Sequence, residues 1–476
     1  MSALSRRACV GGLAGLPFAR APVAGIAALP VRLRAAPARL ALLGEGWPEV
    51  EVWAYEGRVP GPVLRVREGE GLAIELENGL PEPTSLVVHG SPLPFGARDP
   101  PLPVAPEVPP GGRARLVFPL GRAGTFWYRP FFRAAGQVGR GLAGLLVVEE
   151  AEPYPADREL ALVLDDWRLG PGAVNRVRFG PQEAGSRGAI GEIVTVEGRI
   201  APRFEVAAGE RLRLRFLNAA NARIFALRLK GAEAWLLALD GRPLPARPLE
   251  RPLVLAPAMR ADLVVDVPAI RFGRIDLLDE GEGEGSARLA SFAIARDPLP
   301  RPPFSHPPPS LPGSVFPEPD LARAERHELV IDGGLAVLAG ARPPTPEPPP
   351  ALPAPEPAAL RRLSARGLFW MLNGRAAAEN ELAEAPPILR LARGRSHRIA
   401  LCARTLVPVA LHLHGHAFRV LARDGRTEDA WRDTILLGPG ERVEIALSPE
   451  RPGRFALQGT VLEHSASGML GVVEVF

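Results

Sequence analysis

The sequence predicts an all-β protein in which one β-sandwich is repeated three times. Short runs that alternate apolar and polar residues dominate the chain, at 72–76, 212–216, 263–267 and 443–447. Gly or Pro residues bound these runs, and little of the sequence has the period of an amphipathic helix. The pattern is typical of half-buried antiparallel strands, which pack face to face as sandwiches.

The repeat is visible in the strands themselves. Three segments match one another: GEGLAIELEN at 69–78, GERLRLRFLN at 209–218 and, more weakly, GRSHRIALCA at 394–403. A second repeated segment follows each of them, at 110–118, 257–265 and 439–447. Self-similarity of this kind indicates repeated structural units, so we expect three sandwiches, at 31–150, 151–296 and 358–476.

A proline-rich stretch separates the second expected sandwich from the third. Residues 297–357 include PRPPFSHPPPSLPG and PPTPEPPPALPAPEP. Such a composition favours extended backbone without a packed core of its own. We expect this stretch to be a linker that wraps the surface.

Composition limits the classes of function that the chain supports. The 476 residues carry a net charge of +4, and Arg supplies almost all of the basic excess because Lys230 is the single lysine. Arg is spread evenly, which reflects residue usage rather than a basic patch that binds nucleic acid. Aromatic residues, at 6%, are too few to form a base-stacking platform. We therefore expect no nucleic-acid partner.

Residues 1–30 resemble a twin-arginine export signal. Ser5, Arg6 and Arg7 precede a mildly apolar Gly/Ala/Leu stretch that is far too short to span a membrane. An Arg pair that arose by chance in an Arg-rich chain is the alternative interpretation. We expect a monomer that spans no membrane and is exported to the periplasm by the twin-arginine route. Removal of the signal takes Cys9 and leaves Cys402, which excludes an internal disulfide and a multi-cysteine metal site.

Short sequence motifs in all three units resemble those of the three-domain multicopper oxidases, whose domains are cupredoxins. The first unit has PGPVLRVREGEGLAIELEN and GTFWY. The second has LVLDDW, RLRFLNAANARIFAL and LAPAMRADLVVDV, and the third has WMLNG, LHLHGHAF, WRDTILLGPGERVEI and LEHSASGM. The resemblance covers nearly all of the chain after the signal. It implies three consecutive cupredoxin-like Greek-key β-sandwiches and, in that family, four copper-binding motifs.

The chain departs from the family at the motifs that surround the trinuclear copper cluster. The first two motifs normally supply four histidines, and here Val87, Arg129 and Phe131 replace three of them. The fourth motif normally reads His-Cys-His and here reads Gln458-Gly459-Thr460, which removes two more. Three of the eight family positions keep their histidine: His89, His412 and His414.

The mononuclear copper site has lost its thiolate. Blue copper needs a Cys thiolate, two imidazoles and often a weak axial Met. Gly459 replaces the Cys, and Val409 stands where the third motif normally supplies an imidazole. His464 and Met469 remain, but one imidazole and one thioether hold copper poorly, and Cys402 lies on an earlier strand. We expect this site to be empty of copper, with His464 and Met469 kept for packing and hydrogen bonding.

The three surviving cluster histidines are predicted to converge. In the family, the first-motif histidine faces the third-motif strand, and alternation along that strand puts His412, His414 and His416 on one face. Together with His89, such imidazoles suit one Zn²⁺ or Cu²⁺ ion with an open position. The alternative is a metal-free polar cluster that pins the first sandwich to the third. Arg129 favours that alternative, because a guanidinium beside a divalent cation is electrostatically unfavourable.

Arg129 also needs an acidic partner if no metal is present. The resemblance offers Asp99 and Glu463, each near a place where family members keep an acidic residue that delivers protons. We expect Arg129 to pair with one of these two carboxylates.

Two functions are compatible with the resemblance. The first is a non-enzymatic role, similar to that of the exported, copper-free cell-division proteins of the SufI and FtsP group, with no catalytic residues and no cofactor. Its partners would be envelope or division proteins. The second is an oxidoreductase that keeps a reduced copper centre or another mononuclear metal centre. The loss of the thiolate and of five cluster histidines favours the first.

Overall fold

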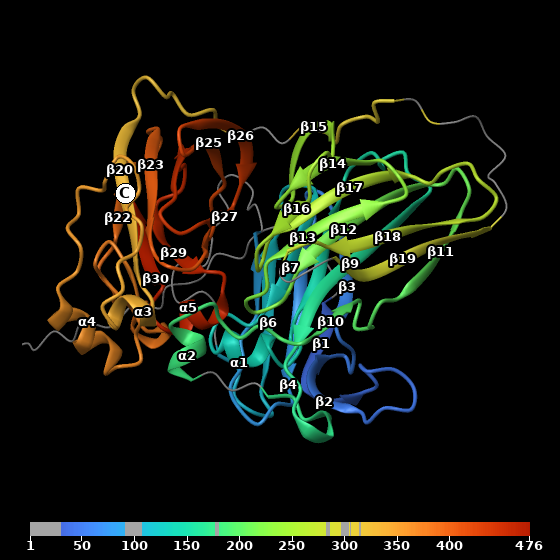
Figure 1. The fold of residues 1–476 in the computed structure, drawn as a ribbon, viewed down its shortest axis with the longest axis horizontal. Helices are drawn as coiled ribbons and strands as arrows, with labels where there is room; N and C mark the ends of the chain where they lie inside the picture. Colours follow the sequence, from blue (N-terminus) through green and yellow to red (C-terminus); the bar gives the residue numbers. More distant parts are fainter. Residues whose placement is uncertain are drawn as a thin grey trace, which may run out of the picture.

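Three β-sandwiches follow one another along the chain, which confirms the predicted all-β fold class (Figure 1). The computed structural model describes residues 30–90, 107–176, 180–281, 286–296, 304, 306–313 and 316–476. The expected export signal and Asp99 lie outside these residues. No helix among them combines the length and the apolar character that crossing a membrane requires.

The first sandwich, blue to cyan in Figure 1, packs two four-stranded sheets around one core. One sheet has the order β2 (Val50–Tyr55), β1 (Val31–Leu40), β4 (Gly71–Asn78), β6 (Arg113–Pro119). The other has the order β3 (Gly61–Arg67), β8 (Gly144–Glu149), β7 (Gly124–Arg129), β5 (Val87–His89). The short helix α1 (Ala134–Val138) connects β7 to β8.

The second sandwich is larger. Its six-stranded sheet has the order β10 (Ile193–Val196), β9 (Arg158–Trp167), β12 (Arg211–Asn218), β17 (Arg260–Asp266), β14 (Ala234–Leu239), β15 (Arg242–Pro248). Its five-stranded sheet has the order β11 (Arg203–Ala207), β19 (Ala287–Arg296), β18 (Gly273–Asp279), β13 (Phe225–Lys230), β16 (Leu253–Leu255). A 3₁₀ turn at Pro171–Ala173 and α2 (Pro181–Ala184) lie between β9 and β10.

The third sandwich repeats the six-plus-five arrangement. One sheet has the order β21 (Trp370–Leu372), β20 (Glu325–Gly333), β23 (His397–Arg404), β28 (Arg442–Leu447), β25 (Phe418–Arg423), β26 (Arg426–Arg432). The other has the order β22 (Leu389–Leu391), β30 (Leu470–Val475), β29 (Gly453–Gly459), β24 (Val409–Leu413), β27 (Thr434–Leu437). Its helical segments are α3 (Leu335–Leu338), α4 (Pro357–Ser364), a 3₁₀ turn (Glu379–Glu381) and α5 (Leu462–Ala466).

The sequence repeats fall on equivalent strands. The first repeated segment (69–78, 209–218 and 394–403) forms β4, β12 and β23. The second repeated segment (110–118, 257–265 and 439–447) forms most of β6, β17 and β28. In every sandwich these two strands pair antiparallel. The strand formed by the first repeated segment also pairs in parallel with the strand that opens the sandwich, which is β1, β9 or β20. The common pairing shows that one topology is used three times.

The expected linker at 297–357 is only partly a linker. Residues 325–333 form β20, which lies inside the third sandwich and pairs along its length with β23. The strand was missed because a parallel partner far along the chain leaves no hairpin signal, and prolines flank it on both sides. The preceding stretch does follow the surface: Tyr154 donates a hydrogen bond to the carbonyl of Pro309 (3.0 Å), and Phe316 stacks on Trp431.

The polar face of β12 is buried rather than half exposed. Arg213 and Arg215 are at most 2% exposed, because the first sandwich covers this face. Both arginines donate to Asp262 (2.7 and 2.9 Å), and Arg215 also donates to Thr125 of β7 (2.9 Å). Burial favours the protonated form of Asp262, but these two cations outweigh it and hold the pKa of Asp262 below its usual range. The alternating arginines therefore join two sandwiches.

Candidate metal centre

Four strands from two sandwiches carry the candidate ligand positions. In the first sandwich β5 pairs with β7, so that Val87 lies opposite Arg129. In the third, β24 pairs with β29, so that His412 lies opposite Gln458. The two strand pairs face each other where the first sandwich meets the third. His89 ends β5.

The structure brings His89, His412 and His414 together. One ring nitrogen of each lies within 4.8 Å of the others. The ring centroids of His89 and His412 are 3.7 Å apart, and those of His412 and His414 are 4.5 Å apart. His89 and His412 are at most 1% exposed. Burial, followed by the neighbouring charges, holds the pKa of His89 and that of His414 well below the ordinary value, so both rings are neutral at pH 7.

His416 does not join this cluster, so the expectation of three histidines on one face was wrong. β24 ends at Leu413, and Gly415 has a φ of +74°, which turns the chain away from the strand direction. The ring of His416 packs edge-on against Phe455 at 4.3 Å, and its Nδ1 lies 3.4 Å from the carbonyl oxygen of His414. Burial lowers the pKa of His416 to about 4.

Among the residues that the structure describes, Arg129 forms no ion pair, so the expected pairing with Glu463 was wrong; Asp99 lies outside these residues. It donates to Gln458 Oε1 (2.9 Å) and to the carbonyl of Pro130 (2.7 Å), and it lies 3.3 Å from His89 Nδ1. Glu463 accepts instead from Asn221 of the second sandwich (2.7 Å), because α5 directs it there. Burial lowers the pKa of Arg129 to about 10, which still leaves it charged at pH 7. A permanent cation therefore stands inside the cluster.

The hydrogen bonds show which ring nitrogen carries the hydrogen in His412 and in His89. Thr434 donates its single hydroxyl hydrogen to Asp433 (2.7 Å), so it can only accept from His412 Nδ1 (3.1 Å). The lone pair of His412 is thus on Nε2, which is buried without a partner among the described residues. His89 Nδ1 accepts from Arg129, which puts the hydrogen of that ring on Nε2.

This arrangement does not fit a bound copper or zinc ion. The rings of His89 and His412 are stacked, with an angle of 27° between their planes. A ligating lone pair lies in the ring plane and needs a metal about 2.0–2.1 Å away, so two stacked rings cannot both point at one ion. The buried guanidinium of Arg129 adds repulsion. Metal binding would require His89 to rotate and lose its contact with Arg129.

The former mononuclear site is filled by its own methionine. A side-chain carbon added at Gly459 would lie 3.0 Å from Met469 Sδ, so the thioether occupies the space of a thiolate. Val409 is fully buried in the core of the third sandwich. His464 donates from Nε2 to the carbonyl of Ser186 (2.6 Å) and packs on Trp370. His464 and Met469 therefore act in packing and hydrogen bonding in this structure.

An ion-pair network that sequence reasoning missed locks the three sandwiches beside the cluster. Arg260 of β17 donates two hydrogen bonds to Asp433 of the third sandwich (2.9 and 2.7 Å). A side-chain carbon on Gly90 of the first sandwich would lie 2.0 Å from Arg260 Nη2, so only glycine fits there. Burial would raise the pKa of Asp433, but Arg260 and His412 hold it well below its usual range. Both residues lie in segments that resemble the family: Arg260 in LAPAMRADLVV and Asp433 in WRDTILL.

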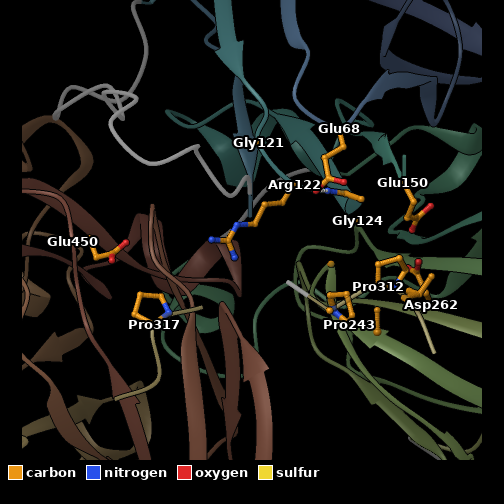
Figure 2. A pocket seen from close by; sticks show the side chains of 15 residues that line it. Glu68, Gly121, Arg122, Gly124, Glu150, Pro243, Asp262, Pro312, Pro317 and Glu450 are labelled. Carbon is orange, nitrogen blue, oxygen red and sulfur yellow. Dashed lines mark hydrogen bonds between the residues drawn. The ribbon is translucent and has the colours of Figure 1, made fainter. Parts of the chain in front are cut away.

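A separate cavity of about 550 Å³ opens where the sandwiches meet (Figure 2). Carboxylates from all three sandwiches line it, among them Glu68, Glu150, Asp262 and Glu450, together with Arg122. Glu150 and Asp262 both accept hydrogen bonds from Arg213, so their charge is already matched. None of the candidate metal ligands is among the lining residues, and the cavity is not part of the histidine cluster.

Comparison with known proteins gives one consistent result. Two multicopper oxidase family models match residues 42–153 and 353–476. The crystal structure of a multi-copper oxidase from Pseudomonas thermotolerans superposes with a TM-score of 0.80 and 31% identity, covering 94% of this chain and 99% of that one. Multicopper oxidase MmcO of Mycobacterium tuberculosis is 26% identical over 91% of this chain and 84% of its own length. Cell division protein FtsP of Proteus mirabilis is 26% identical over 90% of this chain and 86% of its own.

Proposed function

The chain belongs to the multicopper oxidase family, and we propose that it is an exported, copper-free member that binds or scaffolds envelope proteins instead of oxidising a substrate. Its site of action is the periplasm, reached by the twin-arginine route through Arg6 and Arg7. Its partners are proteins of the envelope or of the division machinery. The similarity to FtsP supports this choice of partners.

The hydrogen bond between Arg129 and Gln458 is the observation that carries the proposal. Each residue stands at a position where the family has a copper ligand, and the two come from different sandwiches. Their contact of 2.9 Å is buried and involves a charged donor, which makes it stronger than a neutral hydrogen bond. A pair of copper ligands has thus been replaced by a bond that holds the same two sandwiches together without metal.

Two further replacements have the same effect. Val87 and Phe131 form an apolar cluster with residues of the third sandwich, namely Leu382, Ala456, Leu470 and Val472. Phe131 is fully buried, and its ring lies edge-on to His414 at 5.5 Å. Apolar contact in place of imidazoles stabilises the interface and removes two copper ligands.

Overall similarity does not choose between an oxidase and a division protein, because the chain is equally identical to one of each. The residues at the copper positions make the choice. Without a thiolate at 459, electrons have no covalent path toward a cluster, and without five of the histidines there is no cluster to receive them.

Copper analysis of the purified protein tests the proposal. We expect the copper content after incubation with Cu²⁺ and removal of the excess to be the same in wild type and in His412→Ala, which removes the central histidine cluster. We also expect no intense absorption near the red end of the visible spectrum and no oxygen-dependent oxidation of phenols, aromatic diamines or Cu⁺. A stoichiometric copper content together with any of these oxidations would overturn the non-oxidase function.

Export is tested separately. Changing Arg6 and Arg7 together to Lys should leave the precursor inside the cell, because the twin-arginine receptor reads the pair itself. Fractionation of cells that express the wild type and the double variant measures this. Delivery of the double variant to the periplasm would contradict the assigned route without affecting the copper result.

One observation favours a second candidate, a single metal ion at the residual cluster. Nitrogens of His89, His412 and His414 already lie within 4.8 Å of one another, so a rotation of His89 could bring three imidazoles around Zn²⁺ or Cu²⁺. This centre would make the protein a mononuclear metalloprotein. Its test is the melting experiment on His412 described in the Discussion.

A further inference from the structure

A second group of potential metal ligands lies at one end of the third sandwich, outside the copper motifs. It consists of Glu325, His327 and His397. β20 and β23 run parallel with Glu325 opposite His397, so both strands begin at the same end of the sheet. The three side chains share the face that carries Leu329 and Ile399 of the core. They therefore close the end of the core between the two sheets.

The group consists of two imidazoles joined by a hydrogen bond, with a carboxylate beside them. One potential ligand atom of each residue lies within 4.8 Å of the others. His327 Nε2 is 2.9 Å from His397 Nδ1, and Glu325 Oε2 is 3.7 Å from that same nitrogen. His397 Nε2 lies 2.9 Å from the carbonyl oxygen of Ala392, which can only accept. The hydrogen of His397 is therefore on Nε2, and its lone pair on Nδ1 accepts a hydrogen bond from His327 Nε2–H.

That carbonyl contact is the arrangement found behind metal-bound histidines. A ligating imidazole almost always donates its other N–H to a carbonyl or carboxylate, which fixes both tautomer and ring orientation. His397 is fully buried, so its ring is held in place before any ion arrives.

We propose that Glu325, His327 and His397 bind one divalent transition-metal ion, with Zn²⁺ as the best match. Two imidazoles and one carboxylate are an established ligand set for Zn²⁺. The carboxylate of Glu325 is 45% exposed, which leaves an open path from solvent. A tetrahedral site needs the two nitrogens about 3.3 Å apart for bonds of about 2.0–2.1 Å, against 2.9 Å here. On binding, His327 therefore moves its hydrogen from Nε2 to Nδ1 and turns its ring so that both lone pairs face the ion.

The ion would tie β20 to β23 at the point where the chain enters the third sandwich. β20 is the strand that follows the proline-rich connection, and it has no hairpin turn to fix it against its parallel neighbour. A metal bridge between the first residues of both strands supplies that attachment. The neighbouring Arg395, which lies 3.9 Å from Glu325 and is mostly exposed, forms only a weak ion pair that an ion can displace. The site goes beyond the proposed function and does not depend on it.

Titration of the full-length protein, purified without a polyhistidine tag and stripped with chelator, tests the site. We expect calorimetry with ZnCl₂ to show one ion per chain and the melting temperature to rise with free Zn²⁺. His327→Ala should weaken binding at least about 100-fold and abolish the rise, because even the loss of a residue that only hydrogen-bonds to a metal ligand costs about 10–100-fold. Glu325→Ala, at an exposed position that tolerates substitution, should have the same effect on binding.

Two control variants locate the ion. His306→Ala removes an exposed imidazole elsewhere, and His412→Ala removes the central cluster, so neither should change Zn²⁺ binding. Absence of stoichiometric binding would overturn the proposal. So would binding that survives in both His327→Ala and Glu325→Ala, or binding that is lost in His412→Ala, because either result places the ion elsewhere.

Discussion

At the scale of single residues, neighbouring side chains compensate for the lost copper ligands. Arg129 finds its acceptor in Gln458, and the space of a thiolate at Gly459 is taken by Met469. A buried guanidinium that loses its acceptor costs far more than the net value of the hydrogen bond. The replacements are therefore mutually dependent, and restoring one ligand alone leaves its neighbour without a partner.

The sequence could not predict which residue accepts the hydrogen bond from Arg129. Gln458 is 329 residues away and belongs to another sandwich, and a neutral amide gives no charge pattern to search for. The candidate carboxylates came from the family, where an acid serves copper chemistry. Without copper ligands, Arg129 donates to the nearest acceptor, because a buried cation is costly unless it is hydrogen-bonded.

The central cluster makes a prediction for His412→Ala. Because the structure favours a metal-free cluster, chelator, Zn²⁺ and Cu²⁺ should leave the contribution of this cluster to the melting temperature unchanged. The variant should lose about 1–3 kcal/mol of stability, since Thr434 and Asp433 lose the donor His412 Nδ1. Thermal melts of His412→Ala beside wild type, both in the Glu325→Ala background, isolate this cluster. A metal-dependent rise of several degrees that vanishes with His412 would establish the mononuclear centre instead.

Glu463 makes a prediction about pH. Burial raises its pKa from the ordinary 4.5 to about 7, so the folded state binds this proton more tightly than the unfolded state. Stability from this group is fully present below about pH 4.5 and is lost as pH rises to about 7, a change of about 3 kcal/mol. Glu463→Gln cannot titrate, so its stability relative to wild type should rise by about that amount across the same window. Denaturant unfolding at pH 4.5 and pH 8 measures it, and a constant difference would contradict the raised pKa.

At the scale of secondary structure, what the sequence could predict depended on how each strand is paired. Alternating runs identified β4, β12, β17 and β28, because these strands have apolar faces and clear boundaries. The same reasoning missed β20, whose parallel partner gives no turn signal, and it treated β12 as half exposed. Burial of both faces of β12 depends on where the neighbouring sandwich docks, which alternation within one strand cannot show.

The end of β29 makes a prediction about the mononuclear site. Gly459→Cys should cost about 1–3 kcal/mol, because the new side chain meets Met469 Sδ, and the variant should stay colourless with Cu²⁺. A second imidazole is still missing at Val409. Adding Val409→His should restore a Cys, two His and Met set, with intense absorption in the red when Cu²⁺ is added. Visible spectra of the single and double variants decide this, and a colourless double variant would show that the pocket itself has changed.

At the scale of the whole molecule, buried charged contacts hold the three sandwiches together. Residues from all three sandwiches converge on Asp433 and Gly90, and α5 contacts both α1 and α2 where the sandwiches meet (Figure 1). The family resemblance predicted three sandwiches and the positions of the lost ligands. It did not predict which contacts hold the sandwiches together, since these depend on residues that the copper motifs do not include.

The pair of Arg260 and Asp433 makes the last prediction. Both side chains are at most 1% exposed and join the second sandwich to the third by two hydrogen bonds. Arg260→Met leaves Asp433 as a buried carboxylate without its main counter-ion, so we expect a loss of about 3–5 kcal/mol. Arg228→Met is the matched control, because Arg228 is 40% exposed and its ion pair with Glu280 lies within one sandwich. That control should cost less than about 1 kcal/mol. Denaturant unfolding of both variants measures the difference, and equal losses would mean that the buried pair does not hold the sandwiches together.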